Sequence, residues 1–587
     1  MVQGRRVFMK ILGISDGIMA GAALVDDGKI TAAINEERLS RIKMAEGFPL
    51  RSVYKVLEIS QIEPTDIDYV AVAQVINAFS AHPLPWNDWL NPKGPFTIRS
   101  LSLLSSYLAS IIGTGSLAQM TYYKALKLLT YKRPKGIANL LKENYGIACP
   151  IKFFDHHYTH ATNAYFTSGF KDATVITLDG GGDGLSSQVY RVENGSFEKL
   201  CEVNSFNSIG NYYAYITNIC GFKAHRHEGK ITGLAAHGEP IYKELLSNLI
   251  TYNDGRIVNT GKIYRYSAVK KIKKLLPSDF QIKDLAASMQ KHLEEVVTKY
   301  CNYWVEKSGY SDLALSGGVF ANVRLNQLIH ELTNVDSIYI YPAMGDDGLS
   351  VGAAFALMAD MGTESLRIGE SSHLNDVYLG PDYCNDGIRE VLEKERLNYT
   401  FQEDIESEIA ELLAEGKVVA RFNGKMEYGP RALGNRSILY QPTDPSVMVW
   451  LNERLKRTEF MPFAPSTLHE YARASFKNID GAEYTAQFMN IAFDCTDWMK
   501  ETCTGVIHVD GTARPQIVIK KANPPYYKII DEYRKITDLP TIINTSFNMH
   551  EEPIVCSPHD AVRAFKQSAL DYLAVGNYLV KGSNRSK

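Results

Sequence analysis

The sequence has few cysteines and no organised cysteine motif. Its eight cysteines lie singly along 587 residues, and no two of them form a Cys-x-x-Cys pair. This density is far too low for a disulfide scaffold, which excludes the secreted classes of protein that depend on one. We therefore expect reduced thiols and a cytoplasmic location.

Long hydrophobic runs and an excess of one charge are absent as well. A membrane span needs about 18–20 uninterrupted apolar residues. The nearest candidate, residues 101–120, is interrupted by Ser and Gly, and we expect it to pack as a helix. Because 63 Lys and Arg residues face 66 Asp and Glu residues, no global positive field attracts nucleic acid or an anionic membrane. We expect neither as a partner.

Internal repeats and low-complexity tracts are also missing. With 45% hydrophobic and 22% charged residues, the composition is that of folded globular domains. At about 100–200 residues per domain, the length predicts two large folding units or three to four smaller ones.

An α/β pattern runs through the first two thirds of the chain. Strands at 173–178, 313–315 and 338–341 run into turns rich in Gly, Pro or Asp, and helices follow from about Asn322 and Ser350. Strands ending in glycine turns that open helices are typical of an α/β domain built from two related halves, as in actin-like ATPases and sugar kinases.

Further elements frame this domain. Strands are predicted at 7–14, 22–25, 29–34 and 69–73, with a hairpin turn at Asp26-Asp27-Gly28. Residues 77–145 look like an insertion. The chain becomes polar near residues 370–400, so we place a domain boundary at 375–400. A helix near Ile405 and a strand at 418–422 then open a second domain.

The strongest local motif is Asp-His-His-Tyr-Thr-His at residues 155–160. On a helix, His156 and His160 lie one turn apart on one face, the geometry with which two imidazoles bind a divalent metal. Asp179 and Asp346 follow strands at glycine turns, where ligands bind in open α/β sheets. Such a set suits Fe, Zn or Mn better than Mg. The alternative is that the histidines cap and pack, and that the acids serve an Mg–nucleotide.

Glycine turns at 180–182 and 317–318 form the second signal. Glycine lets backbone N–H groups approach a phosphate, and a helix N-terminus behind the turn attracts anions. Glycine turns occur in many α/β proteins, but two at matching places in two half-domains favour nucleotide binding.

A basic cluster follows in the second domain. The loop Met-Glu-Tyr-Gly-Pro-Arg-Ala-Leu-Gly-Asn-Arg-Ser at 426–437 carries two arginines, and Lys456-Arg457, Arg514 and a polar strand end at 544–548 lie downstream. Arginines on rigid loops bind phosphate bidentately, which favours a small phosphorylated ligand. The alternative is an ordinary surface network of salt bridges.

Together these motifs resemble the O-carbamoyltransferase family that includes the nodulation-factor, cephamycin and tobramycin carbamoyltransferases. The string Met-Glu-Tyr-Gly-Pro-Arg-Ala-Leu-Gly is highly specific to it. The matching stretches follow family order and span nearly the whole chain: residues 36–41, 48–49, 156–160, 229–238, 316–322, 342–348, 426–439, 462–465, 510–515 and 544–548.

The resemblance implies two catalytic domains. Residues 8–375 would form a duplicated actin-like domain, similar to the enzyme that makes threonylcarbamoyladenosine on tRNA, and residues 395–587 a YrdC-like α/β domain that makes carbamoyl-adenylate. ATP with Mg is implied as a co-substrate. Fe(II) or another divalent metal is implied on His156, His160, Asp179 and Asp346.

The resemblance also implies binding residues. Carbamoyl phosphate and ATP are implied to contact Arg431, Arg436, Lys456, Arg514, Asn544 and Ser546. In the first domain the adenylate is implied to contact Gly180, Gly181, Lys230, Gly317, Gly318 and Asn322. Catalytic roles are implied for Lys456, Arg431 and Asp16.

The sequence departs from the family at two places. Ile18 and Met19 stand where family members have a His-Asp pair, and Met461 stands where they have an arginine. The resemblance implies that the missing histidine lies near the transfer site, where it would act as a general base. Asp16 is one expected substitute. His157, which points away from the face of His156 and His160, is another, and the alternative is that the acceptor is deprotonated in a different way.

We therefore predict an ATP-dependent O-carbamoyltransferase. It would form carbamoyl-adenylate and pyrophosphate from carbamoyl phosphate and ATP, and carbamoylate a hydroxyl of a sugar or secondary metabolite. The alternative left open is a nucleotide-binding family member with a decayed transfer site, which acts as a scaffold or has altered donor or acceptor chemistry. A sugar kinase leaves residues 400–587 unexplained. The acceptor is expected at the 77–145 insertion and the Tyr-rich segment 210–216. The oligomeric state, a homodimer included, stays open.

Overall fold

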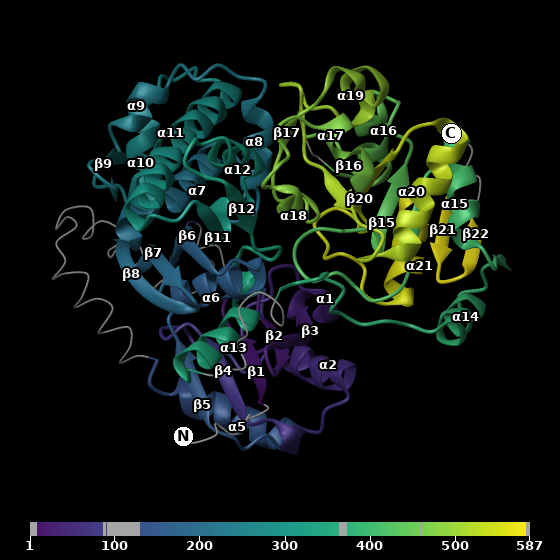
Figure 1. The fold of residues 1–587 in the computed structure, drawn as a ribbon, viewed down its shortest axis with the longest axis horizontal. Helices are drawn as coiled ribbons and strands as arrows, with labels where there is room; N and C mark the ends of the chain where they lie inside the picture. Colours follow the sequence, from purple (N-terminus) through teal and green to yellow (C-terminus); the bar gives the residue numbers. More distant parts are fainter. Residues whose placement is uncertain (1–8, 86–89, 91–129, 363–372, 458–460, 583–587) are drawn as a thin grey trace. The chain divides into compact units, whose positions relative to one another are not determined.

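The computed structural model describes residues 9–85, 90, 130–362, 373–457 and 461–582. Tertiary contacts divide the chain into two compact units, one of residues 1–31 and 44–373 and the other of residues 32–43 and 374–587 (Figure 1). Most of the expected 77–145 insertion, including the helix expected at 101–120, lies outside the described residues.

The first sheet of the first unit has the strand order β3-β2-β1-β4-β5. β1 pairs antiparallel with β2 and parallel with β4, and β4 pairs parallel with β5. The hairpin predicted at Asp26-Asp27-Gly28 and the strand predicted at 69–73 are confirmed. The bounds are β1 (Lys10–Ser15), β2 (Gly21–Asp26), β3 (Lys29–Asn35), β4 (Tyr69–Ala73) and β5 (Ile151–Phe154).

The second sheet has the order β8-β7-β6-β11-β12 and repeats this topology. β6 pairs antiparallel with β7 and parallel with β11, and β11 pairs parallel with β12. In each sheet, three strands that are consecutive in sequence lie side by side, and two later strands extend the sheet beyond the first of them, each parallel to its neighbour. The bounds are β6 (Asp172–Gly182), β7 (Leu185–Glu193), β8 (Ser196–Asn204), β11 (Asp312–Ser316) and β12 (Ser337–Ile340).

Two helices lie against these sheets and against each other (Figure 1). Helix α13 (Leu349–Asp360) contacts β1, β2 and β4, and helix α6 (His156–Ser168) contacts β6 and β11. Every residue of α13 from Leu349 to Met358 is buried, which explains why its sequence has no polar face. A Cβ at Gly352 would overlap the backbone of Thr159 in α6. Glycine therefore permits the close approach of the two helices, which sets the position of α6.

The remaining elements of the first unit are mostly helical. Helices α7, α8 and α12 pack on the long helix α11. The bounds are α2 (Leu50–Ser60), η1 (Pro64–Asp66), α5 (Arg133–Tyr145), η2 (Ser205–Asn207), α7 (Ile209–Ile219), α8 (Glu228–Ala235), α9 (Lys243–Ser247), β9 (Thr251–Asn253), β10 (Arg256–Val258), α10 (Arg265–Leu275), α11 (Ile282–Ser308), η3 (Gly318–Ala321), α12 (Val323–His330) and η4 (Asp346–Gly348).

The second unit is built on an eight-stranded mixed sheet of order β13-β22-β21-β14-β15-β20-β16-β19. Its core joins this sheet to helices α15 and α20, with Leu413, Val419 and Ile530 almost fully buried. The helix and strand predicted to open the second domain are confirmed as α15 and β14. The strands are β13 (Tyr399–Phe401), β14 (Val419–Phe422), β15 (Arg436–Tyr440), β16 (Ala464–Leu468), β17 (Phe493–Asp494), β18 (Thr512–Ala513), β19 (Gln516–Val518), β20 (Thr541–Ser546), β21 (Tyr572–Val575) and β22 (Tyr578–Lys581). The helices are α14 (Asn385–Lys394), α15 (Ile405–Ala414), α16 (Val447–Arg454), η5 (His469–Tyr471), α17 (Ala472–Ser475), α18 (Glu483–Ala486), α19 (Asp497–Thr502), η6 (Thr504–Val506), α20 (Pro524–Thr537) and α21 (Pro558–Ser568).

Residues 32–43, which include helix α1 (Glu36–Ser40), belong to the second unit. The Arg41 guanidinium donates to the carbonyls of Pro553 and Ile554, each at 2.7 Å. Arg38 donates to the carbonyl of Gly429 at 2.9 Å. The sequence analysis placed this segment within the domain 8–375, because nothing local in it reveals such distant partners.

Across the described ranges, no helix has both the length and the apolar character needed to cross a membrane.

Candidate functional site

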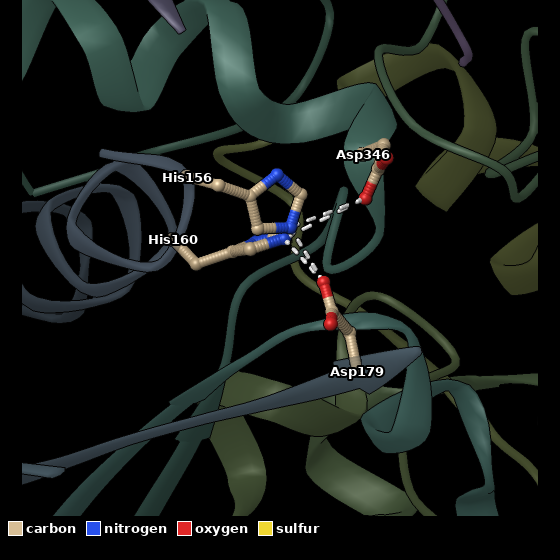
Figure 2. A group of neighbouring side chains, drawn as sticks. All are labelled: His156, His160, Asp179 and Asp346. Atoms are coloured by element: carbon tan, nitrogen blue, oxygen red, sulfur yellow. Dashed lines mark hydrogen bonds and ion pairs between the residues drawn. The ribbon is translucent and has the colours of Figure 1, made fainter. Parts of the chain in front are cut away.

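Four side chains converge at the carboxyl ends of the strands of the first unit (Figure 2). His156 and His160 project from the first turns of α6, which follows β5, Asp179 lies near the end of β6, and Asp346 opens η4 after β12. One ligand atom from each residue lies within 4.8 Å of the others. The set predicted from the His-x-x-x-His spacing and the glycine turns is therefore brought together in space.

The contacts within this cluster are short. His156 Nε2 lies 2.6 Å from Asp179 Oδ2, and His160 Nε2 lies 3.5 Å from the same oxygen. Asp346 Oδ1 lies 3.8 Å from His156 Nε2 and 3.7 Å from His160 Nε2. Both imidazoles thus point their Nε2 atoms at the same two carboxylates.

The opposite nitrogen of each ring is held by a neighbour. Ser316 donates its hydroxyl to the carbonyl of Met344 at 3.3 Å, so its oxygen accepts from His160 Nδ1 at 3.0 Å. This places the His160 proton on Nδ1 and leaves a lone pair on Nε2. His156 Nδ1 lies 2.8 Å from the side-chain amide of Gln74, a residue with a left-handed backbone (φ 64°). Strain of this kind is characteristic of functional sites.

The residues fit a divalent metal. His160 Nε2 and Asp179 Oδ1 are buried and make no hydrogen bond within the described chain, although buried polar atoms are normally paired. Burial lowers the pKa of His156, but the carboxylates of Asp179 and Asp346 outweigh burial and raise the pKa to about 10. Burial raises the pKa of Asp179, yet the imidazoles of His157 and His156 hold it well below its usual value. The cluster therefore favours a positive charge at its centre, as a metal site with N and O ligands requires.

His157 does not point away from this cluster, contrary to the sequence prediction. Its Nε2 lies 3.7 Å from Asp179 Oδ1, and its Nδ1 lies 3.0 Å from the Thr177 hydroxyl, which donates to the carbonyl of Gln188. The first turn of α6 lies across the end of β6, so its residue 157 also reaches Asp179. Burial lowers the pKa of His157 to about 4.

The backbone around Asp179 is irregular. β6 continues through the glycines, with a register shift against β7 between Leu178 and Gly182, and such bulges often re-aim a side chain at a functional site. A Cβ at Gly182 would overlap the His156 ring. Asp183 accepts hydrogen bonds from the backbone N–H groups of Ile76 at 2.6 Å and His156 at 2.9 Å. Glycine and this carboxylate thus hold His156 in place.

Asp16 has a structural partner. Arg133 Nη2 and Nε donate to its two carboxylate oxygens at 2.6 and 2.9 Å, and both side chains are 1% exposed. Since both oxygens are occupied by a buried guanidinium, Asp16 is badly placed to accept a proton from a substrate. Ile18 and Met19, which stand in place of the expected His-Asp pair, are half-buried in the turn between β1 and β2.

The residues predicted to bind adenylate differ in how open they are to a ligand. At 180–182 no helix follows the glycines, contrary to the prediction of a helix N-terminus behind that turn, because the chain returns as β7. Gly318 has open space at its Cβ position and starts η3, so its backbone can approach a ligand. Asn322 caps α12 through Leu325 N–H and is bonded to Gln290, so its amide is already used. The other members of the predicted set lie around these positions: Gly180 and Gly181 at the bulge, Lys230 buried on α8, and Gly317 with φ 112°.

In the second unit, a single carboxylate organises the arginine loop. Glu427 Oε1 accepts hydrogen bonds from the backbone N–H groups of Leu433, Asn435 and Arg436 at 2.7–3.1 Å. The loop that carries the half-buried Arg431 is therefore held in one conformation.

Arg436 is not available as a phosphate ligand, which corrects the sequence prediction. It is fully buried. Its Nη1 donates to the carbonyls of Asn423 and Asn435, and its Nη2 to those of Pro381 and Gly424, at 2.8–3.2 Å. The guanidinium lies 3.8 Å from the centre of the Phe422 ring. Four backbone carbonyls accept from its two Nη atoms, so its role is structural.

The remaining predicted residues lie around the end of β20. Lys456 is exposed, with φ 55°, just after α16. Its neighbour Arg457 contacts the strand end, with Nη1 3.0 Å from Thr545 Oγ1 and Nη2 2.5 Å from the carbonyl of Ser546. Ser546 donates to Asn548 at 2.6 Å. Asn544 is buried and donates to the carbonyl of Ala432 and to Gln516, which gives it a structural role. Arg514 is half-buried after β18.

Comparison with known proteins identifies the family. Residues 10–355 match the family described as carbamoyltransferase N-terminus, and residues 410–582 match carbamoyltransferase C-terminus. The chain belongs to the carbamoyltransferase family. This carbamoyltransferase is 33% identical to nodulation protein NolNO of Sinorhizobium fredii over 95% of the chain and 78% of that protein. It is 32% identical to an uncharacterized protein of Methanocaldococcus jannaschii over 98% of the chain and 99% of that protein.

The structure also shows what the Tyr-rich segment of the carbamoyltransferase does. Tyr212, Tyr213 and Tyr215 of α7 are buried. Tyr212 donates to the carbonyl of Leu246, and Tyr213 donates to Gln290. These tyrosines are core residues, so the expectation that they line an acceptor pocket is wrong.

Sequence reasoning missed several residues that hold the site. Gln74, Asp183 and Arg133 stand in no recognisable motif, and only their contacts reveal them. Glu427 and Ser316 lie inside motifs that were noticed, and their roles could have been inferred from an acid or hydroxyl placed among glycines.

Proposed function

We propose that this carbamoyltransferase is an ATP-dependent O-carbamoyltransferase that acts on a hydroxyl of a sugar or secondary metabolite. The observation that carries the proposal is the cluster of the buried His156, His160 and Asp179 with the half-buried Asp346, in a chain of which both halves match the family. The repeated topology of the two sheets supports an actin-like first unit, and a YrdC-like second unit is proposed with it.

The first step belongs to the second unit. Carbamoyl phosphate, ATP and one water give carbamoyl-adenylate, pyrophosphate and phosphate, because water must open the carbamoyl–phosphate bond before the carbamate oxygen displaces pyrophosphate from the α-phosphorus of ATP. Arg431, Lys456 and Arg514 supply positive charge for the phosphoryl oxygens, and Mg accompanies the ATP. Ser546 supplies a hydroxyl beside the Arg457 guanidinium.

The second step belongs to the first unit. The acceptor oxygen forms a bond to the carbamoyl carbon, the bond from that carbon to AMP breaks, and the hydroxyl proton is released. Gly318 and the bulge at Gly180 and Gly181 offer backbone for the adenylate.

His156, His160, Asp179 and Asp346 would hold Fe(II) or another divalent metal, which as a Lewis acid polarises the carbamoyl oxygen. The chain keeps those ligands in position. Ser316 fixes the ring orientation of His160, and Gln74 that of His156.

An assay of pyrophosphate tests the first step. The protein incubated with ATP and carbamoyl phosphate is expected to release pyrophosphate, and Lys456→Ala is expected to lower the rate. Lys477→Ala, an exposed lysine of the same unit, is the matched control. If the wild-type protein releases no pyrophosphate, the adenylation proposal is wrong and a nucleotide-binding scaffold with a decayed transfer site takes its place.

Metal analysis tests the division of labour. His160→Ala is expected to lose bound metal and carbamoyl transfer while pyrophosphate release persists, because the ligands belong to the first unit. His237→Ala, an exposed histidine of that unit, should keep its metal. An equal loss of pyrophosphate release in His160→Ala would contradict the assignment of the two steps to two units. Mass spectrometry of candidate acceptors for the carbamoyl mass shift then identifies the acceptor.

A further inference from the structure

A tight turn in the second unit brings together a histidine, a threonine and an aspartate. The backbone N–H of His508 donates to the carbonyl of Thr512 at 2.8 Å, and that of Gly511 donates to the carbonyl of His508 at 2.9 Å. Asp510 Oδ1 accepts from the backbone N–H of Thr512 at 3.1 Å. The turn leads directly into β18 and Arg514.

The hydrogen bonds of this turn determine the tautomer of His508. Thr512 Oγ1 donates to Asp510 Oδ1 at 2.7 Å, because a carboxylate can only accept. The hydroxyl proton is then used, so Thr512 Oγ1 accepts from His508 Nδ1 at 3.0 Å. His508 therefore carries its proton on Nδ1 and a lone pair on Nε2. Within the ranges that the structure describes, Nε2 makes no hydrogen bond.

Two cationic side chains lie near the turn. Burial lowers the pKa of His508 to about 4, Asp510 opposes this shift, and Arg514 adds to it. Lys500 lies beside Gly511, since a methyl group there would be 3.3 Å from its Nζ. A neutral imidazole close to a guanidinium is an arrangement suited to an anionic substrate and a water molecule.

We propose that His508 is the base for the water that opens carbamoyl phosphate, with Thr512 and Asp510 as positioning residues. This inference rests on the proposed function. His508 Nε2 takes a proton as the water oxygen bonds to the carbamoyl carbon. The bond from that carbon to the phosphate oxygen breaks, and phosphate leaves with the electron pair. The imidazolium returns its proton to the phosphate, and the carbamic acid loses its second proton to solvent.

The environment explains how so weak a base becomes effective. A phosphate dianion beside Arg514 neutralises the guanidinium and favours the imidazolium, so the basicity of His508 rises when the substrate is bound. Before binding, the lowered pKa keeps the imidazole of His508 neutral, and the hydrogen bond from Nδ1 to Thr512 selects the tautomer with a lone pair on Nε2. Asp510 is exposed and acts through Thr512, where its negative charge stabilises the charge that forms on the ring, the part that a carboxylate plays behind a catalytic histidine.

The test separates the opening of carbamoyl phosphate from adenylation. His508→Asn keeps an amide N–H in the place of Nδ1 and removes Nε2. With carbamoyl phosphate and ATP, we expect its phosphate release to fall at least about 100-fold. With ATP and ammonium carbamate, its pyrophosphate release should equal that of the wild-type protein, because carbamate is the product of the missing step. His469→Asn, an exposed histidine of the same unit, is the control.

The positioning residues have their own readout. Thr512→Val should lower phosphate release less than His508→Asn does, and Thr512→Ser, which keeps the hydroxyl, should recover most of it. Equal activity of Thr512→Val and Thr512→Ser would overturn the positioning role. The base role is overturned if His508→Asn opens carbamoyl phosphate normally, if carbamate fails to restore it, or if the wild-type protein cannot use carbamate. A wild-type protein that releases no pyrophosphate from any donor would instead refute the proposed function.

Discussion

Replacing Asp16 by asparagine distinguishes a structural role from a catalytic one. Asp16 balances the charge of Arg133, and both side chains are 1% exposed. Arg133 also donates to the carbonyls of Gln74 at 2.8 Å and Ala73 at 3.0 Å. Asparagine keeps the size of the side chain but leaves the guanidinium buried without a counter-charge.

The loss of stability follows from this burial. Breaking a buried ion pair by removing one partner costs about 3–5 kcal/mol. The first unit contains about 360 residues, so at about 2.1 cal/mol/K per residue its unfolding entropy is about 0.76 kcal/mol/K. We therefore expect the melting temperature of that unit to fall by about 4–7 °C. In Asp16→Asn/Arg133→Met the loss should be smaller than the sum of the single losses, by about 0.5–3 kcal/mol.

Differential scanning calorimetry of the full chain measures these shifts. Asp254→Asn, an exposed aspartate in the turn between β9 and β10, is the matched control and should leave the transition in place. A general base would behave differently, since its loss costs about 10²–10⁴-fold in rate. A fall in carbamoyl transfer of that size with an unchanged melting temperature would refute the structural assignment.

Three other changes test separate parts of the structure. Burial lowers the pKa of His292 from 6.5 to about 4, so between these pH values only the unfolded chain takes up this proton and stability falls as the pH falls. His292→Phe should remove roughly 3 kcal/mol of this acid destabilisation, seen as a flatter pH dependence of the urea midpoint, and an unchanged pH dependence would contradict it. Arg436→Lys should cost about 2–4 kcal/mol in the unfolding of the second unit because buried carbonyls lose their donors; a raised KM for carbamoyl phosphate without that loss would restore it as a ligand. Gly182→Ala should displace the ring of His156 and weaken metal binding by about 10–100-fold, measured by titration with Fe(II) under anaerobic conditions, whereas Gly229→Ala, with open space at its Cβ position, should bind normally.

The spacing of residues along the chain was sufficient to predict those features whose geometry is set by neighbours in the sequence. The separation of His156 and His160 by one helical turn predicted a shared face, and the glycines that follow Asp179 predicted an acid at a strand end where ligands bind. The hairpin at Asp26-Asp27-Gly28 was equally readable. In each case the decisive geometry is set by a few consecutive residues, whose turn or helix preference is local.

The arginines show where local reasoning ends. Arg431 and Arg436 belong to one motif and look alike in the sequence, yet Arg431 is half-buried, whereas Arg436 is fully buried and donates to backbone carbonyls, among them that of the distant Pro381. A guanidinium binds phosphate or carbonyl groups with the same donors. Its neighbours in space, and not its neighbours in sequence, decide which it binds.

From the sequence alone, the scarcity of cysteine, of long apolar runs and of net charge indicated a folded globular protein, and the motifs indicated its family and the four residues of the candidate metal site. Composition and short spacings suffice for that, since they fix which chemical groups are present. Only the tertiary structure decided that His157 also faces Asp179, that Asp16 is held by Arg133, and that His508, Thr512 and Asp510 form one hydrogen-bonded set. Each of these depends on which side chain lies within about 3 Å of another once the chain is packed, and no sequence pattern here carries that information.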